Sequence, residues 1–323
     1  MRAVVLTQNG EPDVLAVQDW PEPDIGPDQV LIDVAAAGVN FADVMARVGL
    51  YPDAPEPPCV VGYEVAGTIA EVGAGVDNGL TPGQRVFAGT RFGGYAEQVV
   101  VPAKHAFAMP DGMEFPEATA IPVNYATAWA ALIRFANLWR GERVLIHAAA
   151  GGVGIAATHI AKLQGAEVWG TASKVKHDAI RGFGVDHPID YREDSWEEGL
   201  PRFDVVLDGV GGRSFQTSYD LLGYGGRLVA IGSSGVVSGD VKMPRFNVMR
   251  LMTQSKSVIG VNVLKLWDAW DANEMPWVEP LSELLESGSL RPVVAETFPF
   301  ERAPDAHRML VERRNVGKVV LQP

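Results

Sequence analysis

Six residues near the middle of the chain, Ala149 to Gly154, have the types and spacing needed to bind a phosphate group. They read Ala-Ala-Gly-Gly-Val-Gly and lie between residues 143–148, typical of a strand, and residues 152–165, typical of a helix. Glycines let a pyrophosphate approach the backbone, and the helix N-terminus offers free N–H groups. The turn therefore indicates dinucleotide binding by Gly151, Gly152, Val153 and Gly154. A close-packed turn without a ligand is the alternative.

The residues after the next strand indicate which dinucleotide would bind. In NAD sites, a carboxylate about 20 positions further on accepts hydrogen bonds from the ribose. Here residues 170–176 read Gly-Thr-Ala-Ser-Lys-Val-Lys, with cations and hydroxyls but no carboxylate. A 2′-phosphate needs such groups and would be repelled by a carboxylate. The sequence therefore predicts NADPH rather than NADH, unless Lys174 and Lys176 are ordinary surface lysines.

The first part of the chain predicts a compact β-barrel. Short stretches rich in Val and Ile are bounded by Gly, Pro, Asp or Asn, which is typical of strands joined by turns. The predicted strands cover residues 2–6, 29–39, 63–73, 84–89 and 94–102.

From about residue 122, apolar strands alternate with helices, which is typical of a doubly wound parallel sheet. Further predicted strands cover residues 166–171, 203–211, 227–235 and 256–264, and further helices cover residues 173–184 and 214–226. The tail, residues 278–323, predicts helix, strand, helix and strand. We expect the last strand to return to the first domain.

Composition excludes several classes of function. The 323 residues, 47% hydrophobic and 21% charged, are typical of a globular enzyme with two domains. A net charge of −13 disfavours nucleic acid and anionic membrane surfaces as partners. The single cysteine, Cys59, excludes an internal disulfide and suits a cytoplasmic protein. We expect neither a signal peptide nor a membrane span.

Four motifs together resemble a known family: "HAAAGGVG", "GTASKVK", "IDYRE" and "GVNFADVMARVGLYP". Over essentially the whole chain, the sequence resembles the zinc-independent quinone oxidoreductases of the medium-chain dehydrogenase/reductase superfamily. Residues 244–267 resemble their vesicle-amine-transport-protein-like branch. The resemblance implies a GroES-like catalytic domain, residues 1–121 and 266–323, around an inserted Rossmann domain, residues 122–265, which binds NADPH. It also implies a homodimer.

The resemblance further implies which residues bind the cofactor. Ser173, Lys176 and Tyr191 would hold the 2′-phosphate, with the glycine turn under the pyrophosphate. The remaining implied positions, most of them at the nicotinamide half, are Asn40, Thr127, Gly232, Ser233, Asn262 and Asn315.

The residues that zinc relatives use as ligands are replaced here. Their Gly-His-Glu reads Gly62-Tyr63-Glu64, and their cysteine position falls within residues 39–43, which contain no cysteine. The six histidines have no HxxxH or HxxEH spacing. We therefore expect no metal site.

Hydride transfer to a quinone or an α,β-unsaturated carbonyl places negative charge on the acceptor oxygen, which a hydrogen-bond donor would stabilise. The resemblance puts two donors, Asn40 and Tyr51, near the nicotinamide. Tyr51 is the first candidate to bind or protonate the acceptor; an aromatic wall is an equal alternative, and water is another proton source. We expect Asp43 to fix the local backbone or the Asn40 amide rather than to act as a base. Asn124 is a candidate substrate residue, although a hinge or core position is equally natural.

Two other functions remain open. An enoyl reductase acting on a carrier-bound or CoA thioester would need a basic groove, for which Arg134, Arg140, Arg245 and Arg250 are the candidates; the acidic net charge argues against it. A non-catalytic NADPH-binding protein would have no need of Asn40 and Tyr51. Three tryptophans at 267, 270 and 277 would cap an acceptor pocket or pack the linker between domains.

Overall fold

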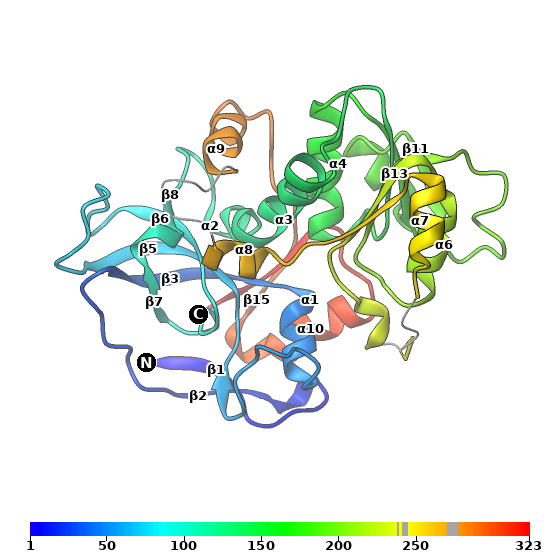
Figure 1. Cartoon of the computed structure of the whole chain (residues 1–323). Helices are drawn as coiled ribbons and strands as arrows, with labels where there is room; N and C mark the ends of the chain where they lie inside the picture. The colour runs from blue at the N-terminus through cyan, green and yellow to red at the C-terminus, as the bar shows by residue number, and fades with distance from the viewer. Residues whose placement is uncertain (238, 241–244, 270–276) are drawn as a thin grey trace. The chain divides into compact units, whose positions relative to one another are not determined.

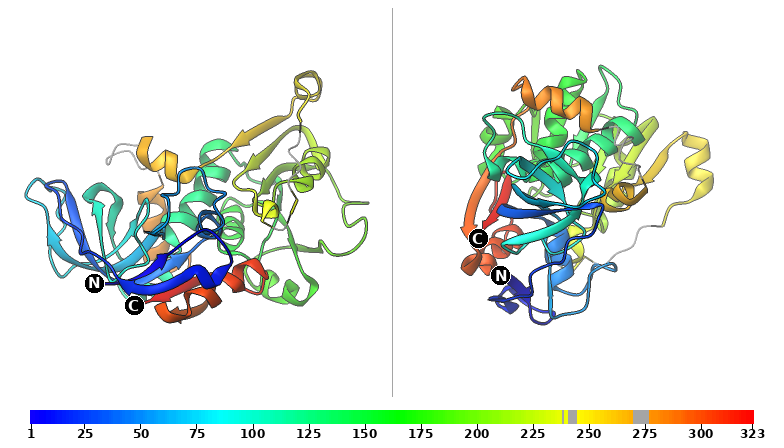
Figure 2. Two further views of the ribbon diagram at one scale, coloured as in Figure 1. Left: turned by 90° about the horizontal axis from the view of Figure 1, so that it is seen from below. Right: turned by 90° about the vertical axis from the view of Figure 1, so that its left-hand side faces the viewer.

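The computed structural model describes residues 1–237, 239–240, 245–269 and 277–323 (Figure 1). Contacts divide the chain into two units. The first unit joins Met1–Val123 with Leu264–Pro323, and the second is the intervening Asn124–Val263. Both chain ends lie in the first unit, and they lie near each other in the further views (Figure 2).

Antiparallel strands dominate the first unit. A small sheet has the order β2-β1-β4, formed by Leu15–Asp19, Arg2–Leu6 and Cys59–Val60. A larger sheet has the order β15-β16-β3-β5-β6-β8, formed by Val294–Pro299, Lys318–Gln322, Gln29–Val39, Glu64–Val72, Arg85–Gly89 and Ala106–Ala108. Strand β7, Gln98–Pro102, also pairs with β3. The C-terminal strand β16 therefore returns to the first unit, as predicted.

The helices of the first unit are short and lie at the ends of these strands. The apolar faces of both sheets share one core with residues of α10, since Val4, Ile32, Val65 and Ala306 are all buried in it. The helices are α1 (Phe41–Arg47), α2 (Phe115–Ala118), α8 (Val263–Ala269), α9 (Val278–Glu286) and α10 (Ala303–Val311), with a π-helical turn at Ile121–Tyr125.

The second unit is a parallel sheet flanked by helices, as its alternating pattern predicts. Its order is β11-β10-β9-β12-β13-β14, formed by His187–Asp190, Glu167–Ala172, Arg143–Ile146, Phe203–Asp208, Leu222–Ala230 and Ser257–Gly260. Every pairing is parallel. The helices are α3 (Ala126–Trp129), a π-helix (Ala130–Phe135), α4 (Gly152–Leu163), α5 (His177–Gly182), α6 (Arg213–Leu221) and α7 (Val248–Gln254).

Three predicted boundaries in the second unit were wrong. The helix predicted for residues 214–226 ends at Leu221, because the following glycines lose the most entropy in a helix and instead extend β13. The strand predicted for residues 256–264 ends at Gly260, and α8 begins three residues later. The helix predicted from residue 173 begins as a 3₁₀ turn, Lys174–Lys176.

None of the helices in the described parts of the chain combines the length and apolar character needed to cross a membrane.

Candidate functional site

The glycine turn of the second unit follows β9 and leads directly into α4. Ala148 has a positive φ of 52°, which turns the chain away from the sheet. The N–H of Gly151 donates to the carbonyl of Ala148 at 2.9 Å, and Gly151 then caps α4 in an extended conformation. The first turn of α4, with Val153, therefore presents its N–H groups at the carboxyl end of the sheet.

The three glycines of the turn are required for different reasons. A Cβ on Gly154 would lie 2.4 Å from the carbonyl oxygen of Ala148, so this glycine permits close packing of helix on strand. A Cβ on Gly152 would lie 2.1 Å from the amide oxygen of Asn124. A Cβ on Gly151 would meet only the Ala148 carbonyl oxygen, at 3.3 Å. Protein packing explains Gly151 least, and the approach of a pyrophosphate explains it best.

Asn124 and Thr127 lie beside this turn. Both are buried, and the amide of Asn124 sits against Gly152 within the same unit. Thr127 belongs to α3, which packs against α4. Asn124 is thus brought to the glycine turn, next to the position expected for a cofactor.

The groups expected to hold a 2′-phosphate come together after β10. Ser173 is buried and follows the last residue of that strand directly. Burial is the largest cause that lowers the pKa of the half-buried Lys176. Tyr191 raises this pKa and Arg192 lowers it, which shows that the three side chains are neighbours. Lys174 is exposed, so of the two lysines only Lys174 fits the alternative of an ordinary surface lysine. Arg192 is a cation that the sequence analysis missed.

The nicotinamide positions lie at the same edge of the sheet. Gly232 and Ser233 follow β13, and Asn262 follows β14. Ligands of open parallel sheets bind at this carboxyl edge. The edge thus carries the glycine turn, Ser173 and the two loops that the resemblance assigns to the cofactor.

A buried hydrogen-bond network, which sequence reasoning missed, supports this edge from within. The Nε2 atom of His147 lies 3.0 Å from the Oγ of Ser218, which donates to Asp208 at 2.8 Å. The other ring nitrogen, Nδ1, lies 3.3 Å from the Oγ1 of Thr171. Burial lowers the pKa of His147, so the ring is neutral near pH 7. The network ties together the ends of β9, β10 and β12.

The first unit contains a buried ion pair between Glu64 of β5 and Lys318 of β16. Glu64 is 0% exposed and the Lys318 residue 2% exposed. The Lys318 ammonium donates to Glu64 and, at 2.7 Å, to the amide oxygen of Asn40. The Asn40 Nδ2 donates to the same Glu64 oxygen at 2.7 Å, and the second Glu64 oxygen accepts the N–H of Val123 at 2.8 Å. Asn40 is therefore held by two partners of opposite charge.

Asp43 fixes the start of α1, as predicted. Its carboxylate accepts the backbone N–H of Asn40 at 2.7 Å. Burial raises the pKa of Asp43 from 3.8 to about 7, although the hydrogen bond from Asn40 and the charge of Lys318 lower it in part. Gly38 completes the cluster, because a Cβ there would lie 2.5 Å from a Glu64 oxygen.

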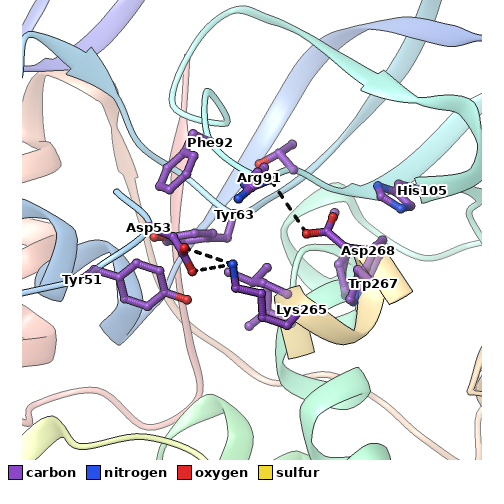
Figure 3. A pocket seen from close by; sticks show the side chains of 14 residues that line it. Tyr51, Asp53, Tyr63, Arg91, Phe92, His105, Lys265, Trp267 and Asp268 are labelled. Carbon is purple, nitrogen blue, oxygen red and sulfur yellow. Dashed lines mark hydrogen bonds and ion pairs between the residues drawn. The ribbon is translucent and has the colours of Figure 1, made fainter. Parts of the chain in front are cut away.

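A pocket of the first unit, part of it open to solvent, is lined by 14 residues (Figure 3). Aromatic side chains form much of its wall. The ring centroids of Tyr51 and Tyr63 lie 5.6 Å apart, and those of Tyr63 and Phe92 lie 5.2 Å apart. On another side, His105 meets Trp267 at 5.1 Å. Tyr51 thus lies in a pocket whose wall is in large part aromatic.

Two ion pairs connect α8 to the loops of the pocket. Lys265 pairs with Asp53 at 3.0 Å, and Arg91 pairs with Asp268 at 3.8 Å. Figure 3 shows both pairs at the pocket. Burial, the largest cause, lowers the pKa of His105, which leaves it neutral near pH 7. The formal charges of the described lining residues therefore balance.

The remaining predicted residues have separate places. Trp277 is buried against Trp267 at 5.4 Å and against Phe107, so the two tryptophans pack within the first unit. Trp270 lies outside the described residues. The amide of Asn315 donates to the Gly317 carbonyl at 2.9 Å. Within the described ranges, no three His, Cys, Asp or Glu side chains gather to hold a metal ion.

Comparisons with known proteins agree with this arrangement. Residues 26–111 match the family described as alcohol dehydrogenase GroES-like domain, and residues 183–321 match the one described as zinc-binding dehydrogenase. The human synaptic vesicle membrane protein VAT-1 homolog is 36% identical over 345 residues, which cover 100% of this chain and 86% of the human protein.

Two solved structures are similar over the whole fold. Escherichia coli quinone oxidoreductase complexed with NADPH matches with a TM-score of 0.90 and 29% identity, covering 100% of both chains. The CurK enoyl reductase matches with a TM-score of 0.88 and 28% identity, covering 99% of this chain and 98% of that chain.

The buried ion pair generates a prediction about stability. Replacing Lys318 by Met leaves the Glu64 carboxylate buried without its cation, which should lower the free energy of unfolding by about 3–5 kcal/mol. Lys265→Met is the matched control, because it breaks an exposed pair and should cost about 0–1 kcal/mol. Urea unfolding at pH 7 measures both. Equal losses in the two variants would contradict the assigned role of Lys318.

The raised pKa of Asp43 generates a prediction about pH. Between pH 4 and pH 7 the folded protein keeps this proton and the unfolded chain does not, so stability falls as the pH rises, by at most about 1.4 kcal/mol per pH unit. The fall ends above pH 7. The free energy of unfolding is measured with urea at each pH for wild type and for Asp43→Asn, and the difference between them isolates this slope. Asp111→Asn, at an exposed position, is the control. A difference that does not change with pH would show that Asp43 ionises normally.

Proposed function

The chain belongs to the medium-chain dehydrogenase/reductase superfamily, and from this premise we propose that it is an NADPH-dependent reductase of quinones or other α,β-unsaturated carbonyls that works without zinc. Membership makes it an oxidoreductase of this type; the cofactor and the acceptor class are the proposal. The observation that carries it is the end of β10, where Ser173 and Lys176 stand and residues 170–176 contain no carboxylate; the nearby Asp190 carboxylate accepts backbone N–H groups instead.

The second unit binds NADPH in this proposal. Gly151 to Gly154 lie under the pyrophosphate, and Ser173, Lys176 and Tyr191 hold the 2′-phosphate, to which Arg192 adds a cation. The quinone oxidoreductase that matches this chain was solved with NADPH, which supports the choice. Gly232, Ser233 and Asn262, with Thr127, Asn315 and Asn40, complete the proposed set. When bound, NADPH supplies the hydride.

The aromatic pocket of the first unit binds the acceptor. Tyr51 donates a hydrogen bond to the acceptor oxygen as negative charge develops there. Asn40 is the second proposed donor; Glu64 and Lys318 fix its amide in one orientation, which is the preorganisation that such a donor needs. Asn124, beside the glycine turn, is kept as a minor substrate contact.

An enoyl-thioester reductase is the second candidate, because the CurK enoyl reductase shares the fold. A thioester carrier would need unpaired cations. Of the four arginines considered for a basic groove, Arg250 faces Asp220 at 3.7 Å. The cations that line the described pocket, Arg91 and Lys265, are both paired with carboxylates, so we prefer the quinone or enone acceptor. A homodimer and a cytoplasmic location remain predictions. The stopped-flow experiment below distinguishes the reductase from a protein that binds NADPH without catalysis.

Stopped-flow oxidation of bound cofactor tests the proposal. We expect NADPH to be oxidised rapidly by 1,2-naphthoquinone or an α,β-unsaturated ketone, with NADPH preferred over NADH, and crotonyl-CoA to react more slowly. Tight NADPH binding without oxidation by the quinone or ketone would reject this function. Oxidation by crotonyl-CoA alone would establish the enoyl reductase instead.

The cofactor assignment makes a separate prediction. Ser173→Asp places a carboxylate beside the 2′-phosphate and should weaken NADPH binding about 100-fold while leaving NADH affinity nearly unchanged. Ser195→Asp adds the same charge at an exposed turn of the same unit and serves as control. Fluorescence titration with each cofactor measures both variants. Unchanged NADPH affinity in Ser173→Asp would place the phosphate elsewhere.

A further inference from the structure

Tyr63 has a buried hydroxyl that its surroundings do not satisfy. The residue is 1% exposed, yet its hydroxyl has no hydrogen-bond partner among the described residues. Buried hydroxyl groups are normally paired, because an unpaired one loses its hydrogen bonds to water without replacement. The unpaired hydroxyl of Tyr63 therefore needs a physical reason. A ligand that accepts its hydrogen bond when bound is one such reason.

The same residue lines the aromatic pocket. Figure 3 shows the Tyr63 ring between Tyr51 and Phe92, deep behind the Asp53–Lys265 ion pair. Tyr51 and Phe92 hold the ring at tilt angles of 58° and 54°. Its position is thus fixed by packing from both sides, as expected of a group that must meet a bound molecule in one geometry.

Tyr63 can act only as a neutral phenol. Burial raises its pKa far above the ordinary value for tyrosine, and the negative charge of Asp43 raises it further. The hydroxyl therefore keeps its proton near pH 7. A phenol in this state donates one hydrogen bond, and the partner it lacks is an oxygen or nitrogen acceptor.

The pocket also restricts what carries that acceptor atom. Aromatic side chains form the wall, and the described charges pair as Asp53–Lys265 and Arg91–Asp268. A charged ligand would find no counter-charge there without breaking a pair. A flat, uncharged molecule bearing oxygen atoms matches these walls.

We propose that the Tyr63 hydroxyl is a specificity-determining donor that binds a second oxygen of the acceptor, so that the pocket selects flat, uncharged acceptors with two oxygens over acceptors with one. This inference rests on the proposed function, in which Tyr51 binds the first oxygen. An acceptor with one oxygen leaves the Tyr63 hydroxyl buried and unpaired, which is how sites built for a hydrogen bond reject analogues that cannot form it.

Tyr63→Phe tests the inference, because it removes only the hydroxyl. The variant should lose about 10-fold in kcat/KM for 1,2-naphthoquinone, which has two adjacent oxygens, and keep its value for 4-phenyl-3-buten-2-one, which has one. Comparing each variant with wild type on the same acceptor cancels the intrinsic reactivity of the two acceptors.

Tyr219→Phe is the matched control. Its hydroxyl is also buried without a partner among the described residues, but it belongs to the second unit and packs on Phe246. Both variants remove an unsatisfied hydroxyl, so each should raise the Tm of the ligand-free protein by about 2 °C. Only Tyr63→Phe should change the preference between acceptors.

Binding without turnover separates this inference from the proposed function. Quenching of tryptophan fluorescence by 1,2-naphthoquinone, without cofactor, should give a Kd about 10-fold higher in Tyr63→Phe than in wild type. If wild type oxidises no NADPH but this difference in Kd is found, the reductase proposal fails and the donor role stands. Equal Kd values, or equal losses of kcat/KM on both acceptors, would overturn the role of Tyr63.

Discussion

The buried ion pair between Glu64 and Lys318 is the interaction on which the first unit depends. It joins β5 to β16 and holds Asn40 at the start of α1, so both ends of the chain meet at one charged cluster. Charges so deeply buried are costly, and additional hydrogen bonds help to offset that cost. Here the backbone N–H of Val123, the last residue before the second unit, donates a further hydrogen bond to Glu64. The cluster therefore fixes both Asn40, the proposed donor, and the end of the first chain segment at Val123.

In the second unit the constraint is the parallel sheet, whose strand ends converge on one edge. The His147–Ser218–Asp208 network holds those ends in place, with Ser218 bridging the neutral imidazole and the Asp208 carboxylate. At this edge, the backbone N–H groups of the glycine turn and the cations near Tyr191, Lys176 and Arg192, are the groups that we propose to meet the cofactor. In the proposal, the absence of a carboxylate from residues 170–176 favours NADPH, while the nearby Asp190 carboxylate is engaged by the backbone N–H groups of Lys174 and Arg192.

The inserted arrangement was implied by the family resemblance. The sequence pattern itself predicted the parallel sheet, several strands of the first unit and the role of Asp43, because periodic apolar patterns and short-range capping are local properties. It failed where glycines compete between helix and strand, as at residues 222–226. It also missed Arg192, and it missed the His147 network, whose members Thr171 and Ser218 lie 24 and 71 residues from His147 along the chain. Tyr63 entered the sequence analysis only as a replaced zinc ligand; its unpaired hydroxyl and its place between two rings exist only after the strands have paired.

The central claim is that hydride passes from NADPH to an acceptor held by residues of this chain, without help from a metal. Single turnover with NADPH deuterated on the transferring face of C4, after exhaustive treatment with a chelator, tests it most directly. We predict that mass spectrometry of the reduced enone will find one deuterium at the β-carbon and that the rate will match that of untreated protein. A product without deuterium, or a rate that returns only when zinc is added, would contradict this account.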